Sequence, residues 1–332
     1  MPSRPTMHDV ARVAGVSAKT VSRVVNDEPR VDPLTRERVV QAIASLGFQR
    51  NEQARSLRPG QRSTLIGMVT GDLGNPFYSA IARGIEEVGR LHGYLLLSSS
   101  SEEQPARERQ LIEALLRHNV EGLLIVPAAG DHRYLTSAML SDVPLLVIDR
   151  PITGGHEFDT VVLENRQGAF DVVSALIRAG HRRIGVIDGD SEVYTGSERM
   201  QGYFSALEHA GLTPEVSLIR RGFHGGSQAE RATLELLHQA QPPTAIFATN
   251  NRIAVGVLSG MKGAGKWLPL ACFDDFELAD MLPVPVTVVT YDAAEMGRSA
   301  AELLFARLKG FTGAPVTKSL PVQVRTYPTV HS

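Results

Sequence analysis

The stretch Asp9-Val-Ala-Arg-Val-Ala-Gly-Val-Ser-Ala-Lys-Thr-Val-Ser-Arg-Val-Val-Asn26, close to the amino terminus, predicts two short amphipathic helices separated by a glycine turn. Val10, Val13 and Ala14 recur at helical spacing and predict the buried face of the first helix. We expect Gly15 to end that helix, because glycine adopts a left-handed backbone without a steric penalty.

Ser17 is a suitable N-cap for the second helix, which we predict over residues 18–26. Its predicted buried stripe consists of three valines: Val21, Val24 and Val25. A third helix is expected between Asp32-Pro33 and Gly47. Its apolar face is Val39, Val40, Ile43 and Leu46. Two short helices joined by Gly-Val-Ser predict a helix-turn-helix.

The second helix carries small and hydrogen-bonding residues away from its valine stripe. The candidate DNA-binding residues here are Ser17, Ala18, Lys19, Thr20, Ser22, Arg23 and Asn26. Arg23 has the fork geometry that pairs with guanine, and Ala18 suits a thymine methyl group. The three hydroxyl side chains suit phosphates, which fix register more than sequence. The alternative is an ordinary solvated helix face in a small bundle.

The charge of the chain is distributed unevenly. The net charge is −2 over 332 residues, but residues 1–62 carry eleven Lys/Arg and six Asp/Glu, so this segment is near +5 and the remainder near −7. A small basic head on an acidic body favours a polyanionic partner for the head. A chain of this length also predicts two or three domains.

Residues 9–26 resemble, over a long ungapped run, the DNA-binding headpiece of the LacI/GalR family of bacterial repressors, and the similarity continues through residues 35–39 and 46–48. The resemblance implies a homodimer whose two headpieces read double-stranded, near-palindromic operator DNA. The predicted headpiece spans residues 1–50, followed by a hinge helix and linker over residues 51–63.

Residues 51–58 form a segment too short to be a stable helix alone, and Pro59-Gly60 ends it. The segment resembles the family's hinge helix, which docks in the minor groove. The resemblance implies that Leu57 is an apolar wedge, that Ala54 is a neighbouring contact, and that Arg55 suits phosphate. Two residues depart from the family pattern, Arg50 in place of proline and the acidic Glu52. A flexible linker is the alternative.

The body, residues 64–332, alternates short apolar runs with amphipathic helices, which predicts an α/β fold with two doubly wound parallel sheets. The predicted strands are residues 65–69, 94–97, 122–126, 145–148, 183–187, 216–219, 245–248, 270–273 and 286–291. We expect an N-lobe of about residues 64–162 and 292–322. We expect a C-lobe of about residues 163–291 and 323–330, with residues 320–325 strand-like.

Ligands of such sheets bind beyond the carboxyl ends of the strands, where polar side chains recur in this chain. Ser98 to Ser101 are expected just after the second strand. The body also resembles this family and periplasmic sugar-binding proteins. The resemblance implies effector contacts at Asn75, Asp149, Arg199, Asn250 and Asp274, with wall residues Phe77, Leu163 and Phe223. Near the pocket the chain departs from the family in Asn251 and Arg252, and in the shortened segment before Asp274.

A neutral sugar is the first expectation for the effector, with a sugar phosphate or a sugar acid close behind. Arg150, Arg199 and Arg252 permit an anionic ligand. The single Cys272 allows no internal disulfide or multi-cysteine metal site, and no metal, cofactor or enzymatic activity is expected. No apolar run is long enough to span a membrane, and a cytoplasmic location is expected.

A solute-binding protein with the same body and no DNA role is the alternative function. The basic head and the missing secretion signal favour the regulator. No leucine heptads follow residues 320–325, so we expect a dimer without further tetramerisation.

Overall fold

The computed structural model describes residues 5–48, 63–189, 193–223 and 225–328. The chain divides into two compact units, Met1–Ser63 and Thr64–Ser332, and each is described by itself. The predicted fold class is confirmed, since three amino-terminal helices precede two α/β lobes.

The first unit contains the predicted helix-turn-helix. Its described helices are α1 (Met7–Ala14), α2 (Ala18–Val25) and α3 (Pro33–Leu46). The Thr6 side chain caps α1, and Gly15 ends it with a φ of +65°. The hydroxyl of Ser17 accepts the backbone N–H of Thr20 at 3.1 Å and so begins α2 immediately after the turn.

The core of the first unit differs in part from the predicted one. Val10, Val21, Val24 and Val39 are buried, as are Ala11, Ala14 and Ala42. However, the side chains of Val13 and Val40 are 54% and 53% exposed, so their predicted burial was wrong. Helix α1 contacts both α2 and α3, and its buried face is centred on residues 10, 11 and 14. The side of α1 that carries Val13 is therefore not covered by the other two helices.

The second unit contains two six-stranded sheets. The first has the order β11 (Thr317–Leu320), β5 (Asp159–Leu163), β4 (Leu145–Ile148), β3 (Gly122–Ile125), β1 (Leu65–Thr70) and β2 (Leu95–Ser100). The second has the order β12 (Gln323–Tyr327), β10 (Val286–Thr290), β9 (Leu270–Cys272), β8 (Ala245–Ala248), β6 (Ile184–Ile187) and β7 (Ile219–Arg220). Neighbouring strands are parallel except that β12 runs antiparallel to β10.

Helices cover both faces of each sheet, as expected for doubly wound lobes. In the first lobe they are α5 (Pro76–Leu91), α6 (Pro105–Arg117), α7 (Ser137–Leu140) and α12 (Ala293–Leu308). In the second lobe they are α8 (Asn165–Arg178), α9 (Tyr194–His209), α10 (Gly226–Leu237) and α11 (Asn251–Ala264). Short 3₁₀ turns occur at Val216–Leu218 and Ala279–Met281. Gly84 allows α5 to approach α12 closely, because a Cβ there would lie 2.0 Å from the carbonyl oxygen of Ala294.

Several strand predictions need correction. The run 216–219 is mostly a 3₁₀ turn, and only its last residue belongs to the two-residue strand β7. Ser98 to Ser100 lie within β2 and not after it. Strands β5 and β11 were not predicted, and they pair with each other at the edge of the first sheet.

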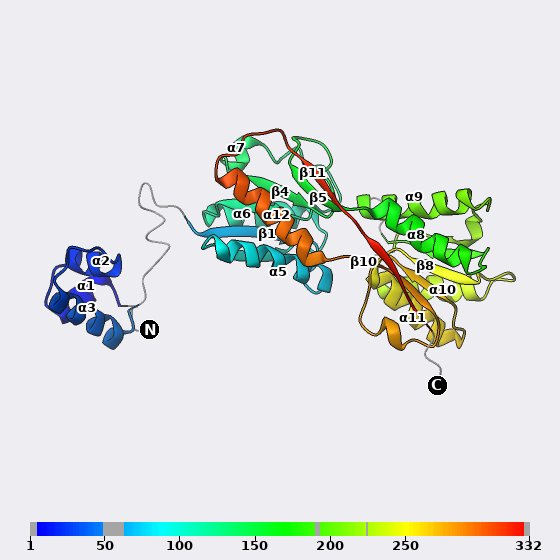
Figure 1. The fold of residues 1–332 in the computed structure, drawn as a ribbon, viewed down its shortest axis with the longest axis horizontal. Helices are drawn as coiled ribbons and strands as arrows, with labels where there is room; N and C mark the ends of the chain where they lie inside the picture. The colour runs from blue at the N-terminus through cyan, green and yellow to red at the C-terminus, as the bar shows by residue number, and fades with distance from the viewer. Residues whose placement is uncertain (1–4, 49–62, 190–192, 224, 329–332) are drawn as a thin grey trace. The chain divides into compact units, whose positions relative to one another are not determined.

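The chain passes between the lobes at three described segments, after β5, after β10 and after β11 (Figure 1). The last strand of the first sheet, β11, is followed almost at once by β12 of the second sheet. These crossings join the two sheets. The loops that follow the strands of one sheet therefore lie against the loops that follow the strands of the other.

Candidate functional site

A cavity of about 750 Å³ lies where loops from the carboxyl ends of both sheets meet. All seven candidate effector residues line it: Asn75, Phe77, Asp149, Arg199, Phe223, Asn250 and Asp274. The volume is in the range of small-molecule sites. Leu163, expected in the wall, belongs instead to the buried core, because it lies inside β5 and not beyond its end.

Both asparagines of the candidate set also cap helices. Asn75 Oδ1 accepts the backbone N–H of Phe77 at 3.1 Å and begins α5. Asn250 Oδ1 accepts the backbone N–H of Ile253 at 2.9 Å and begins α11. Their side chains are thereby held in fixed positions at the cavity wall.

In the first lobe, the lining is dominated by a charged cluster around Arg150, which is 5% exposed. Its guanidinium donates to Glu103 at 2.9 and 3.2 Å and to the Tyr78 hydroxyl at 2.9 Å. It also lies 3.4 Å from Asp149, whose backbone has a φ of +73°. Burial raises the pKa of the Asp149 carboxyl above its ordinary value. Glu103 and Tyr78 were not predicted as site residues, because their positions depend on chain segments distant in sequence.

In the second lobe, Arg199 is held by three contacts. Its guanidinium donates to Asn165 Oδ1 at 2.9 Å and to the backbone carbonyl of Thr249 at 2.8 Å. The guanidinium carbon also lies 3.7 Å from the centre of the Phe273 ring, a cation–π geometry. The Thr249 hydroxyl donates to Asp188 at 2.9 Å. Burial raises the pKa of that fully buried carboxyl.

Asp274 joins the end of β9 to two neighbouring elements. One carboxylate oxygen accepts the backbone N–H of Asn251 at 3.0 Å, and the other accepts the Tyr291 hydroxyl at 2.6 Å. The side chain is 7% exposed and lines the cavity. Asp274 therefore connects the cavity to the start of α11 and to the segment that crosses back to the first lobe.

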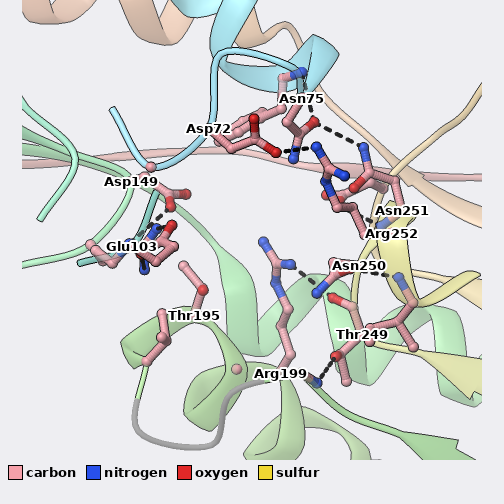
Figure 2. Close-up of a pocket in the computed structure, with 18 of the residues that line it drawn as sticks. Asp72, Asn75, Glu103, Asp149, Thr195, Arg199, Thr249, Asn250, Asn251 and Arg252 are labelled. Atoms are coloured by element: carbon pink, nitrogen blue, oxygen red, sulfur yellow. Dashed lines mark hydrogen bonds and ion pairs between the residues drawn. The ribbon is translucent and has the colours of Figure 1, made fainter. Parts of the chain in front are cut away.

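Two side-chain contacts bridge the lobes at the cavity. The Asn251 amide donates to Asn75 Oδ1 at 3.1 Å, and Arg252 forms an ion pair with Asp72. Figure 2 shows Glu103 and Asp149 on one side of the cavity and Asn250, Asn251 and Arg252 on the other. Asn251 and Arg252, the residues near the pocket that depart from the family pattern, are thus the ones that contact the opposite lobe.

We expect Arg252→Ala to increase the opening of the ligand-free cavity. Both partners of the ion pair with Asp72 are about half exposed, so the interaction contributes only about 0.2–1 kcal/mol. Distances between spin labels on the two lobes measure the opening. Arg220→Ala is the matched control, since Arg220 pairs with Glu235 inside one lobe. Equal distance distributions for wild type and Arg252→Ala would show that the ion pair does not restrain the lobes.

In the first unit, α2 directs polar side chains away from the helix core. Ser17, Lys19 and Asn26 are exposed, while Ala18, Thr20, Ser22 and Arg23 are partly exposed, and Val21 and Val24 are buried beneath them. Arg23 lies 3.6 Å from Glu28 in an exposed ion pair. The candidates Ala54, Arg55 and Leu57, and the departures Arg50 and Glu52, lie outside the described residues.

Ser17→Ala is expected to destabilise α2 by about 1 kcal/mol, because the N-cap hydroxyl accepts the Thr20 N–H. Amide hydrogen exchange of the full-length protein should then be about fivefold faster within α2. Ser45→Ala is the control, since that hydroxyl bonds the carbonyl of Ala42 within α3 and caps no helix. Unchanged amide exchange within α2 would contradict the role of Ser17 as the N-cap of this helix.

Comparisons with known proteins match this arrangement. A family model described as bacterial regulatory proteins, lacI family, matches residues 6–51, and a periplasmic binding protein-like domain matches residues 173–326. The catabolite control protein A of Priestia megaterium is 32% identical over 304 residues, which cover 90% of this chain and 91% of that protein. The chain belongs to the lacI family. The membership predicted from residues 9–26 is therefore confirmed, and this LacI-family chain is a DNA-binding transcriptional regulator.

Other relatives agree with this LacI-family assignment. The transcriptional regulator GalR of Escherichia coli is 32% identical, with 91% of this chain and 88% of that protein covered. The lac repressor dimer bound to operator and the anti-inducer ONPF has a TM-score of 0.84 and 25% identity, covering 99% of this chain and 100% of that one. The regulator CelR in complex with cellobiose has a TM-score of 0.72 and 29% identity, covering 97% and 98%.

The part of the LacI-family chain that the structure describes contains no helix long and apolar enough to cross a membrane. Within the same residues, no group of three or more His, Cys, Asp or Glu side chains is arranged to hold a metal ion.

Proposed function

We propose that this regulator is a cytoplasmic repressor whose affinity for operator DNA is set by a sugar or sugar phosphate bound in the cavity of the second unit. The observation that carries the proposal is the cavity itself. It is lined from both lobes by carboxylates, amides and aromatic rings, and it occurs in a chain whose first unit is a helix-turn-helix. A relative solved with cellobiose supports a sugar-like effector.

On the DNA side, α2 enters the major groove and its exposed face reads base edges. Arg23 pairs with a guanine, Ala18 contacts a thymine methyl, and the hydroxyl groups near the start of α2 bind phosphates. Two chains form a homodimer and read an inverted repeat, so the operator is near-palindromic. The relative solved as a dimer on operator DNA supports this stoichiometry.

On the effector side, Asn75, Asp149 and their neighbours in the first lobe face Arg199, Asn250 and Asp274 in the second. A ligand that contacts both lobes favours one angle between them, and it shifts DNA affinity by its differential affinity for the two states. The expected coupling is about 1–3 kcal/mol, or about 5- to 150-fold in affinity. We propose that the cavity binds its ligand without catalysing a reaction. Its asparagines cap helices and its arginines are bonded to neighbouring protein groups, which are structural roles.

Selection of duplexes from a random library by the full-length protein tests the DNA proposal. We expect an enriched inverted repeat, since symmetry of the dimer imposes symmetry on the site. Mobility shifts of the enriched duplex and of a scrambled duplex give the specificity ratio. Recovery of sequences with no common motif would contradict operator recognition.

A further inference from the structure

The charged side chains that line the cavity indicate whether its ligand is anionic or uncharged. This inference rests on the proposal that the cavity is the effector site. Arg150, Arg199 and Arg252 line it, and the sequence alone leaves an anionic sugar derivative open. Whether such a ligand fits depends on what those arginines already bind. An unengaged guanidinium favours a phosphate or carboxylate, whereas one that is already paired does not.

Arg150 is neutralised by two carboxylates. Glu103 accepts from both terminal nitrogens of its guanidinium at 2.9 and 3.2 Å, and Asp149 lies 3.4 Å from Nε. The Tyr78 hydroxyl accepts a further bond at 2.9 Å. The bidentate geometry to Glu103 is the geometry that a ligand phosphate would need. An entering anion would therefore have to displace a carboxylate that is already in place.

The backbone is shaped to hold that carboxylate. Glu102 and Glu103 both have left-handed backbones, with φ of +55° and +56°, and Asp149 has a φ of +73°. This conformation is unfavourable for residues other than glycine and persists where surrounding contacts require it. Gly71 contributes as well, since a Cβ there would lie 2.0 Å from Glu103 Oε1. The fold thus stabilises a strained loop that keeps Arg150 paired.

The other two arginines are also engaged. Arg252 forms an ion pair with Asp72, and Arg199 donates to Asn165 and to the Thr249 carbonyl while its guanidinium stacks on Phe273. The carboxylates of the lining are Asp72, Glu102, Glu103, Asp149, Asp188 and Asp274. Among the described residues, these six carboxylates outnumber the guanidiniums even when Arg107 and Arg221, which pair with Glu102 and Asp188 from outside the lining, are added to the three arginines of the lining.

Acceptors without partners occur on both sides of the cavity. Among the described side chains, the buried atoms of lining residues that lack a hydrogen bond are Asp149 Oδ1, Asn251 Oδ1 and Arg150 Nε. The last of these already faces the Asp149 carboxylate at 3.4 Å. The two oxygens, one from each lobe, need donors, and buried unsatisfied acceptors are costly. Hydroxyl or amino groups of a ligand supply such donors, and phosphate or carboxylate oxygens do not.

We infer that the effector is a polyhydroxylated molecule without an anionic group, whose donors reach Asp149 Oδ1 in one lobe and Asn251 Oδ1 in the other. This choice excludes sugar phosphates and sugar acids from the range of ligands that the proposed function allows. A neutral sugar and an amino sugar satisfy the same two acceptors. The three arginines then position other residues and do not bind ligand charge.

Calorimetric titration of the full-length protein at constant ionic strength tests the inference. The panel consists of matched sets on one carbon skeleton: glucose, glucosamine, glucose 6-phosphate and gluconate, with the equivalent galactose and ribose sets, and cellobiose. We expect the uncharged or amino member of the binding set to have an affinity at least about tenfold above its anionic counterparts. Tighter binding of a phosphate or acid overturns the inference, as does a panel in which no uncharged or amino member binds.

Glu103→Gln tests the cause of the selectivity. Removing that charge leaves Arg150 with one carboxylate, so the ratio of sugar-phosphate affinity to neutral-sugar affinity should rise at least about fivefold. Glu113→Gln is the control, because Glu113 is partly exposed and pairs with Arg109 outside the cavity. An equal affinity ratio in wild type and Glu103→Gln contradicts the assigned role of Glu103. These titrations contain no DNA, so a failure of operator binding is a separate result.

Discussion

Replacement of Asp274 by alanine is expected to weaken effector binding at least about 100-fold while operator binding without effector persists. The Asp274 carboxylate accepts the Asn251 N–H at 3.0 Å and the Tyr291 hydroxyl at 2.6 Å. These two bonds hold the carboxylate and the start of α11 at the cavity wall. A ligand hydrogen bond to a charged group is worth about 1.5–3 kcal/mol, and about 2.8 kcal/mol corresponds to about 100-fold in affinity. The substitution also releases the amino end of α11, from which Asn251 reaches the other lobe.

The control for this experiment is Asp275→Ala. Asp275 is the adjacent carboxylate but is exposed, accepts the Tyr327 hydroxyl at 2.8 Å, and does not line the proposed effector cavity. Titration calorimetry with the sugar that binds wild type most tightly should show a loss for Asp274→Ala alone. Thermal unfolding of both variants separates loss of the site from loss of the fold. Wild-type affinity in Asp274→Ala would place the effector elsewhere.

Arg23→Ala is expected to reduce discrimination between the operator and single-base variants by about 1–3 kcal/mol, or about 5- to 150-fold. The Arg23 side chain is 43% exposed on α2, and its ion pair with Glu28 is long at 3.6 Å, so the guanidinium is available to a guanine. Because a bidentate contact reads one base pair, the loss should be confined to one position in each half-site. Mobility shifts with a set of operator variants measure the effect.

Arg12→Ala is the matched control for Arg23→Ala. Arg12 lies on α1, where its side chain is 78% exposed and pairs with Asp9 at 2.5 Å. Removing this positive charge should change affinity for all sequences to a similar extent, because nonspecific attraction to phosphate does not depend on the base. If Arg23→Ala shows the same uniform change, Arg23 contacts the DNA backbone and not a base edge.

Much of the cavity could be predicted because parallel strands deliver their loop residues to one edge. Asp149, Asn250 and Asp274 each follow a short apolar run, so their placement at a common edge follows from the fold class. Family resemblance then selected which of the strand-end residues to favour. The sequence did not predict that Asn250 also caps α11 or that Asp274 accepts the backbone N–H of Asn251, and only the structure shows these contacts.

The features that escaped prediction depend on long-range packing. Glu103 reaches Arg150 only because Gly71, distant in sequence, leaves space for it. The strand β11 has the sequence Thr-Lys-Ser-Leu, whose residues are mostly exposed, and its pairing with β5 defines it. The exposed valines of the first unit show the same limit, since helical spacing marks a possible core face without specifying which side the neighbouring helices cover.

We propose that occupancy of the cavity controls the affinity of the helix-turn-helix for operator DNA. The most direct test is fluorescence anisotropy of the selected operator duplex with the full-length protein, with and without saturating sugar, for wild type and Asp274→Ala. We predict that the sugar changes the wild-type dissociation constant at least about fivefold, in line with typical allosteric coupling, and leaves that of Asp274→Ala unchanged. Identical wild-type dissociation constants with and without bound sugar would contradict the claim.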